Sequence, residues 1–101
     1  MSTALFAHPA CLDHDNGPGH PERPDRLRAV LRALESETFA TLLREEAPEA
    51  TVEQLSRAHP QHYVEAILSI TPPAGERLML DPDTAMGAGS REAALRAAGA
   101  A

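Results

Sequence analysis

The side chains best suited to chemistry lie in one short stretch near the start of the chain. Residues 20–27 read His-Pro-Glu-Arg-Pro-Asp-Arg-Leu and follow a polar, glycine-bearing segment at 13–19. An ordinary helix start needs one proline at its first position and one acidic residue in its first turn. Two prolines and two arginines with acidic neighbours exceed that need. We therefore expect a rigid loop whose polar groups have assigned places, leading directly into a helix.

Three histidines in this region raise the question of a metal site. His8, His14 and His20 are six positions apart, and aspartates flank the middle one. Histidine and carboxylate side chains are zinc ligands by type. Equal spacing along a loop does not define a tetrahedral site, however, and Cys11 is the only cysteine. We expect structural or hydrogen-bonding roles for these histidines and assign no metal to the chain.

A second group of acidic residues follows residue 80. Asp81, Asp83 and Glu92 occupy positions 1, 3 and 12 of a possible calcium-binding loop. Such a loop needs an oxygen ligand at position 5 and a glycine at position 6. This chain has Ala85 and Met86 there, so a calcium site is not expected. The sequence Asp-Pro-Asp-Thr favours a turn instead.

Short strands and helices must position these residues. Residues 3–7 form an apolar run typical of a buried strand. Residues 8–23 hold proline, glycine, aspartate and asparagine at turn-forming density and predict a long loop. Apolar side chains then recur at i, i+3, i+4 and i+7, which predicts an amphipathic helix over 24–34. One or two further helical turns are expected around 39–43.

The second half of the chain predicts three more helices. Thr51 and Gln54 have the spacing of a capping box at the start of a short helix. Pro60 begins another helix, which the segment Thr-Pro-Pro-Ala-Gly at 71–75 ends. Ser90 is expected to cap an alanine-rich final helix, whose small side chains allow close packing.

Composition narrows the possible classes of protein. The net charge of −6 argues against a nucleic-acid-binding module, which would carry a basic stripe. One cysteine excludes an internal disulfide. No apolar run approaches the ~20 residues that a membrane span needs. We expect a piece of one cytoplasmic α/β domain, without a membrane or a direct nucleic-acid partner, and leave its oligomeric state open.

Four parts of the sequence, in order, resemble the zinc-dependent histone deacetylase family, in its bacterial, class II-like branch that includes the acetylpolyamine amidohydrolases. They are Leu-Phe-Ala-His at 5–8, the run at 20–27, Ala-His-Pro-Gln-His-Tyr-Val-Glu-Ala-Ile at 58–67, and 80–84 together with 89–99. The resemblance implies an α/β fold of the arginase/deacetylase type, with a parallel sheet flanked by helices. It also implies hydrolysis of acetyl-lysine or acetylpolyamine amides to an amine and acetate, with zinc as cofactor of the complete enzyme.

The resemblance also implies what this chain does not contain. The family's paired histidines, its Asp-x-His zinc motif, its second zinc aspartate and its transition-state tyrosine have no counterpart here. We therefore expect residues 1–101 to be the N-terminal fragment of a single deacetylase domain, without catalytic or metal-binding residues and inactive alone. The alternative is a non-catalytic interaction or structural fragment, or the product of a decayed gene.

The family assigns a further role to the arginines of the first stretch. It places an arginine at the spacing of Arg26 in an internal cavity beneath the zinc, beside the phrase that contains Pro21. A guanidinium there can hydrogen-bond a departing acetate through two donors, because it is planar and always charged. Some relatives carry this arginine at the position of Arg23. We favour Arg26 and leave Arg23 open.

The remaining assignments also come from the resemblance. The loop histidines, His14 and His20, are expected to support the wall of the active-site tunnel. Asp81 matches a rim aspartate that accepts hydrogen bonds from the backbone of an acetyl-lysine substrate, although a simple turn role is equally compatible. His59 and Tyr63 have catalytic side-chain types, but we expect both to be scaffold.

Overall fold

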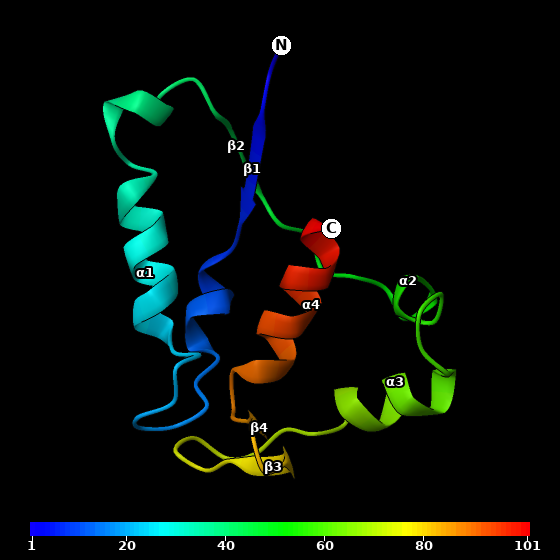
Figure 1. Cartoon of the computed structure of the whole chain (residues 1–101). Helices are drawn as coiled ribbons and strands as arrows, with labels where there is room; N and C mark the ends of the chain where they lie inside the picture. The colour runs from blue at the N-terminus through cyan, green and yellow to red at the C-terminus, as the bar shows by residue number, and fades with distance from the viewer.

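The computed structural model describes all 101 residues. The chain forms short strands and helices, joined by loops, in an α/β arrangement. The chain begins with a strand, a 3-10 helix and a helix, and it ends on its longest helix (Figure 1). In order, the elements are β1 (Ala4–Ala7), η1 (Pro9–Asp13), α1 (Pro24–Ala33), η2 (Glu37–Phe39), β2 (Leu43–Glu46), α2 (Val52–Leu55), α3 (Gln61–Leu68), β3 (Leu78–Asp81), β4 (Thr84–Met86) and α4 (Ser90–Ala100).

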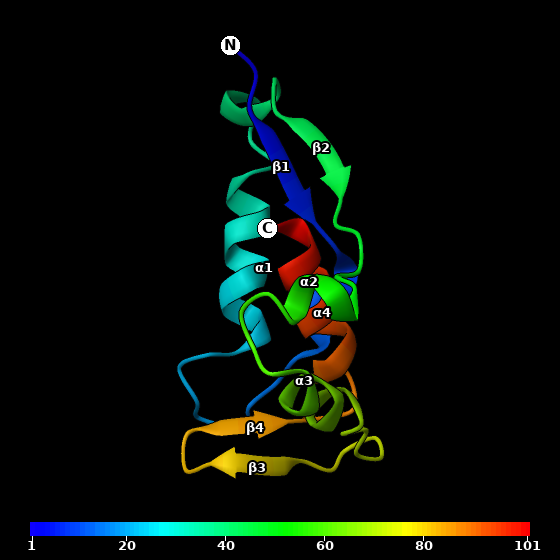
Figure 2. The ribbon, with the colours of Figure 1, turned by 90° about the vertical axis from the view of Figure 1, so that its right-hand side faces the viewer.

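The first half of the chain is a β-α-β unit. β1 pairs with β2 in parallel, with Ala4 opposite Leu43 and Ala7 opposite Glu46. Parallel strands need a crossover connection, and α1 lies within it. Figures 1 and 2 show α1 on one side of the strand pair and α4 on the other. β3 and β4 form a separate antiparallel hairpin beyond the carboxyl ends of β1 and β2.

The buried core is small and is made mainly of alanine. Only nine residues are buried, and no large side chain is fully enclosed. α1 has a proline at its first turn and the predicted apolar stripe, yet it buries no residue, and Val30 is 47% exposed. The apolar side chains of β1 and α1 therefore line an open surface instead of a closed core. No helix combines the length and apolarity that crossing a membrane requires.

The tightest packing joins α4 to the segment after β2. The Ala50 N–H donates to the Leu95 carbonyl at 2.9 Å, and the Arg96 Nη1 donates to the Ala47 carbonyl at 2.9 Å. Gly99 permits this approach, because a Cβ atom there would collide with the Pro48 carbonyl oxygen. The glycine near the end of α4 is thus a packing requirement, since Gly is otherwise unfavourable in a helix.

Local sequence signals predicted several elements correctly. The strand near 3–7, the helix near 24–34 and the capping box are confirmed, but the strand is not buried, since Phe6 is 47% exposed. In the capping box, Thr51 Oγ1 accepts from the Gln54 N–H and Gln54 Oε1 accepts from the Thr51 N–H. The helix that begins after Pro60 is also confirmed.

Three expectations were wrong. Residues 39–43 are not further helical turns, because η2 ends at Phe39 and β2 begins at Leu43, where pairing with β1 fixes an extended backbone. The long loop is interrupted by η1, whose first turn is capped by the His8 side chain accepting from the Ala10 N–H. Gly89, not Ser90, is the N-cap of α4, which frees the Ser90 hydroxyl for other contacts.

Replacing Gly99 with alanine should loosen α4 from the segment at 47–50. Overpacking against a backbone carbonyl costs about 1–3 kcal/mol, which exceeds the ~1 kcal/mol that alanine normally gains over glycine in a helix. The amide of Ala50 should therefore exchange with solvent several-fold faster in Gly99→Ala. Gly87→Ala is the control, because its Cβ would meet its nearest neighbour, the Glu76 carbonyl oxygen, at an ordinary 3.8 Å. Equal Ala50 exchange in both variants would contradict the packing role.

Candidate functional site

Polar side chains gather beyond the carboxyl end of β1. They come from the loop at 14–22, the start of α1, the β3–β4 hairpin and the start of α4. In open α/β sheets, ligands bind outside the carboxyl ends of the strands, where the loops meet. We call the contacts that join this loop to the hairpin and to α4 the loop clamp, and its members are His14, Asn16, His20, Glu22, Asp83 and Ser90.

His14 and Ser90 connect the loop to the start of α4. His14 Nδ1 lies 2.7 Å from Ser90 Oγ, and the same hydroxyl accepts from the Gly87 N–H at 2.8 Å. Ser90 is buried, with 4% of its surface exposed. A buried hydroxyl needs its hydrogen bonds satisfied, and here both partners are in place. The contact holds the loop at a fixed distance from α4.

Asn16 connects the loop to the hairpin. Its Oδ1 accepts from the Ala85 N–H at 3.1 Å, and its Nδ2 donates to Glu22 Oε2. Nδ2 also lies 3.3 Å from His14 Nε2. These three partners assign the amide orientation, since only one orientation lets each atom bond correctly. Asn16 therefore bonds to β4 and also to two residues of its own loop.

His20 makes a third connection, to the turn of the hairpin. Its Nε2 lies 2.9 Å from Asp83 Oδ1, and its Nδ1 accepts from the Glu22 N–H at 3.0 Å. The hydrogen bond to the Asp83 carboxylate raises the pKa of His20. Protonation of Nδ1 would displace the Glu22 amide, which opposes this effect. The charge-assisted bond to Asp83 is the stronger of the two interactions.

Asp81 organises the turn of the same hairpin. Its Oδ1 accepts from the Asp83 N–H at 2.7 Å, and its Oδ2 accepts from the Thr84 hydroxyl at 3.0 Å. Hydrogen bonds to the charged form lower the pKa of Asp81. The side chain is exposed at the tip of the hairpin, so it is a fixed carboxylate on the surface.

The arginines of the first stretch are placed differently from one another. Arg26 lines a groove of about 620 Å³ with His14 and Glu22, whereas Arg23 and Pro21 do not line it; all three residues are exposed. Arg28 points elsewhere and pairs with Asp25 at 2.9 Å. Six of the nine arginines have a hydrogen-bond or ion-pair partner. The guanidinium of Arg26 has none, and most of the residues that line the groove with Arg26 are apolar.

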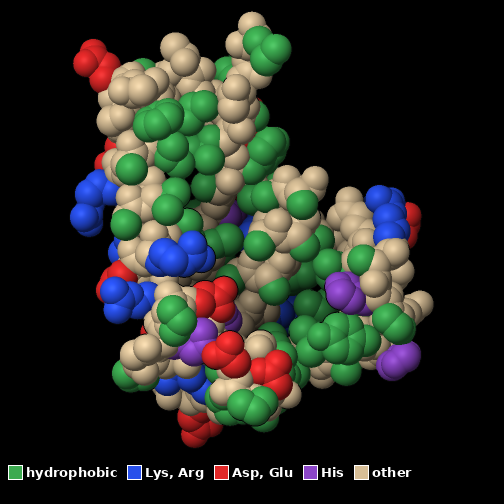
Figure 3. All heavy atoms as spheres, viewed as in Figure 1, with side chains coloured by type: hydrophobic (Ala, Val, Ile, Leu, Met, Phe, Trp, Pro, Cys, Tyr) green, Lys and Arg blue, Asp and Glu red, His purple; other side chains and the backbone are tan.

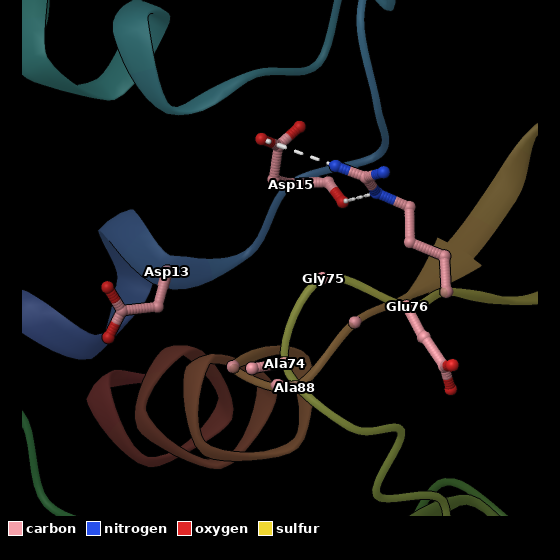
Figure 4. A pocket seen from close by; sticks show the side chains of 9 residues that line it. Asp13, Asp15, Ala74, Gly75, Glu76 and Ala88 are labelled. Carbon is pink, nitrogen blue, oxygen red and sulfur yellow. Dashed lines mark hydrogen bonds and ion pairs between the residues drawn. The ribbon is translucent and has the colours of Figure 1, made fainter.

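A second hollow, of about 460 Å³, lies on the other side of the loop. Asp13, Asp15 and Glu76 line it, but Figure 4 shows Asp13 and Glu76 pointing in different directions. The third acidic residue, Asp15, is already paired with Arg77. The Arg77 Nη2 lies 3.6 Å from Asp15 Oδ2, and the Arg77 Nε donates to the Asp15 carbonyl at 3.0 Å. These acids do not converge on one point, so they do not form a cation site.

The loop histidines do not converge on one point. His8 caps η1 and lies 3.6 Å from Glu46. His14 and His20 both contact Glu22, but His14 otherwise contacts Ser90 and His20 contacts Asp83. Cys11 contacts the Ala93 carbonyl at 3.8 Å. Across the 101 residues, no three histidine, cysteine, aspartate or glutamate side chains lie close enough together to hold a metal ion.

His59 and Tyr63 are not members of the loop clamp, although Tyr63 lines the same groove as Arg26. Their rings stack at a tilt, with centroids 5.5 Å apart, where α2 and α3 meet. The scaffold role expected for them stays a prediction.

Sequence reasoning missed the central members of the loop clamp. Asn16 was noticed only as a loop residue, and Ser90 only as a cap. Their partners lie 69 and 76 positions away along the chain, so no local pattern contains the contact. The one available signal was the excess of polar residues around the glycines of the loop.

Comparisons with known proteins bear on this arrangement. A family model described as the histone deacetylase domain matches residues 20–101. A histone deacetylase-like amidohydrolase of Pseudomonas aeruginosa is 33% identical over 117 residues, covering 98% of this chain and 30% of that protein. The crystal structure of the HDA15 HD domain superimposes with a TM-score of 0.83 at 30% identity, covering 97% of this chain and 29% of that one. This similarity confirms the predicted α/β deacetylase-type fold.

The His20–Asp83 contact should make the stability of the chain depend on pH. The pKa of His20 is raised in the folded state, so protonation of His20 stabilises the fold, and this contribution is fully present below the unfolded pKa of 6.5. The contribution is lost as pH rises through the pKa of the folded state. Asp83→Asn should lower the pKa of His20, measured by NMR titration of the ring protons. Asp25→Asn, which removes an exposed carboxylate paired with Arg28, should leave it unchanged. An unaltered His20 titration in Asp83→Asn would contradict this assignment.

Proposed function

Because this chain belongs to the histone deacetylase domain family, we propose that it forms the N-terminal part of a zinc-dependent deacetylase that hydrolyses acetyl-lysine or acetylpolyamine amides to an amine and acetate. The chain spans about a third of the length of the relatives reported above. The activity therefore belongs to a catalytic domain larger than these 101 residues. The placement of Arg26, an unpaired guanidinium lining an apolar groove beside the loop clamp, is the observation that carries the proposal.

The family implies zinc for the complete enzyme, and we propose that residues outside this chain hold it. No set of three potential ligands lies together in this chain, and structural or catalytic zinc sites need at least three protein ligands. The metal would be bound by other parts of the domain. What this chain supplies is the surroundings of the reaction: the loop wall, the rim and an anion-binding side chain.

Arg26 is proposed to bind the acetate product. A guanidinium presents paired N–H donors that match the two oxygens of a carboxylate. In this chain no acidic side chain neutralises it, so its donors remain available for a ligand. Arg26 is exposed in this structure, and Leu27 and Leu31 line the groove with it. Covering of this groove by further parts of the domain would lower the local dielectric constant and strengthen the attraction for an anion. Arg23 remains the alternative, although it lies outside the groove.

His14, His20 and Asp81 are proposed to shape the access to that site. The two histidines bond the loop to α4 and to the hairpin, which keeps the loop from collapsing into the groove. Asp81 is ionised and fixed by two hydrogen bonds within its turn. Each carboxylate oxygen can accept a second hydrogen bond, so Asp81 is suited to accept from the backbone amides of a peptide substrate.

The chain by itself should not deacetylate any substrate. Purified protein supplied with zinc should show no turnover of acetyl-lysine peptides or acetylpolyamines, because it lacks a metal-binding set. The Pseudomonas amidohydrolase, assayed in parallel, is the positive control. Zinc-dependent turnover by this chain that a hydroxamate abolishes would contradict the proposal that the catalytic residues lie elsewhere.

In a complete domain, Arg26 should matter for turnover and Arg28 should not. The test replaces the matched 117 residues of the Pseudomonas amidohydrolase with this chain. Loss of a charge-assisted anion contact is worth about 1.5–3 kcal/mol, so Arg26→Ala should lower turnover roughly 10- to 100-fold. Arg28 lies about 200° around α1 from Arg26 and pairs with Asp25 on the surface. Arg28→Ala should therefore change stability by less than about 0.5 kcal/mol.

Arg23→Ala separates the two assignments within the same chimera. Loss of turnover in Arg23→Ala with full activity in Arg26→Ala would move the anion-binding role to Arg23. Full activity in both variants would remove that role from the stretch at 20–27. A chimera that folds and binds zinc but has no activity would contradict the proposed function.

A further inference from the structure

The turn of the β3–β4 hairpin is attached to the loop through one side chain. Arg77, just before β3, donates to the loop at 3.0 Å, and the Ala85 N–H of β4 donates to it at 3.1 Å. Only His20 reaches the turn, where its Nε2 lies 2.9 Å from Asp83 Oδ1 and 3.2 Å from the Asp83 carbonyl oxygen. A hairpin of two strands is marginally stable by itself, so the position of this turn depends on the His20 contact.

The ring of His20 is held in an orientation that makes it a donor to the turn. The Glu22 N–H donates to Nδ1 at 3.0 Å, which places the proton of the neutral ring on Nε2. The protonated ring carries a proton on Nε2 as well. His20 therefore donates to Asp83 in both protonation states. The His20 side chain is 20% exposed and the Asp83 side chain 88%, so the histidine is the fixed member of the pair.

Asp83 transmits this constraint to Asp81. The Asp83 N–H donates to Asp81 Oδ1 at 2.7 Å, and the Thr84 hydroxyl donates to Oδ2 at 3.0 Å. Thr84 lines the groove of Arg26, whereas His20 lines neither hollow. His20 thus acts on this region through the turn and without lining the groove. Figure 3 shows histidine and acidic side chains gathered where the loop and the hairpin meet.

We propose that His20 is a positioning residue for peptide substrates, which holds the Asp81 carboxylate, through Asp83, where it accepts hydrogen bonds from substrate backbone amides. This inference rests on the proposed function, in which Asp81 accepts those bonds. An acetylpolyamine carries no such backbone amides. Binding of a peptide should therefore depend on His20, whereas binding of an acetylpolyamine should not.

Three variants separate the donor from the bulk of the side chain. His20→Leu removes the donor and keeps an apolar side chain of similar size. His20→Gln keeps an N–H donor near the position of Nε2. His62→Leu makes the same change at an exposed histidine of α3 outside the loop clamp, and it is the matched control. Circular dichroism checks that each variant keeps the fold of the wild type.

The first measurement uses the chain alone. In His20→Leu the Asp83 amide should exchange with solvent several-fold faster, because the turn is no longer anchored. The pKa of Asp81, which the hydrogen bonds from Asp83 and Thr84 lower, should rise toward its usual value. His20→Gln and His62→Leu should keep the wild-type exchange and titration. Unchanged values in His20→Leu would overturn the proposal.

The second measurement uses the chimera with the Pseudomonas amidohydrolase and compares an acetyl-lysine peptide with N-acetylputrescine. His20→Leu should raise KM for the peptide about tenfold with little change in kcat, since it weakens one binding contact. Both constants for N-acetylputrescine should stay as in the unmutated chimera. His20→Gln should restore most of the affinity for the peptide. In an Asp81→Ala background, His20→Leu should add little, because it acts through Asp81.

The remaining outcomes also decide the matter. Equal losses on the two substrates would show a merely structural role and overturn the proposal. Additive effects of His20→Leu and Asp81→Ala would overturn the connection between the two residues. A chimera without activity on either substrate would contradict the proposed function, whereas exchange and titration in the chain alone would still decide whether His20 holds Asp81.

Discussion

The structure depends on a constraint that parallel strands impose. A parallel pair is stable when both of its faces are covered, because its strands are joined by a crossover helix and carry apolar side chains on both sides. Here β1 and β2 pair over only four residues each, and α1 and α4 cover the two faces incompletely. The apolar stripe of α1 and the alanine face of α4 consequently converge on one open groove along β1. The small core and the open groove are two consequences of the same geometry.

The loop clamp is anchored on two residues of this small core, Ser90 and Ala85. Its hydrogen bonds begin and end within the chain: His14 with Ser90, Asn16 with the Ala85 amide, and His20 with Asp83. These contacts join three segments, the loop, the β3–β4 hairpin and α4, that the sheet alone would not hold together. The loop at 14–22 therefore has its shape before any further part of a domain is added. The polar half of the candidate site is organised by contacts within the chain, whereas the apolar half is an open groove.

The sequence predicts the features that depend on local signals and misses those that depend on long-range contacts. α1 and the capping box at Thr51 were predictable because periodicity and capping involve residues within one or two turns. β2 was not, because Leu-Arg-Glu-Glu has no apolar alternation and is extended only through its pairing with β1. The partners of Asn16 and Ser90 were likewise hidden, since both contacts span most of the chain. The resemblance located the stretch at 20–27, but only the fold separates Arg26, inside the groove, from Arg23, outside it.

Arg26 lies where the two halves of the site meet. Its neighbours are apolar on the side of β1 and α1 and polar on the side of His14 and Glu22. Most other arginines of the chain have hydrogen-bond or ion-pair partners. An arginine that served only solubility would not need to lie in an apolar groove. A charge that is removed from water without a partner is costly. Any further part of a domain that covers the groove would therefore make binding of a small carboxylate at the Arg26 guanidinium more favourable, because no carboxylate of this chain pairs with it.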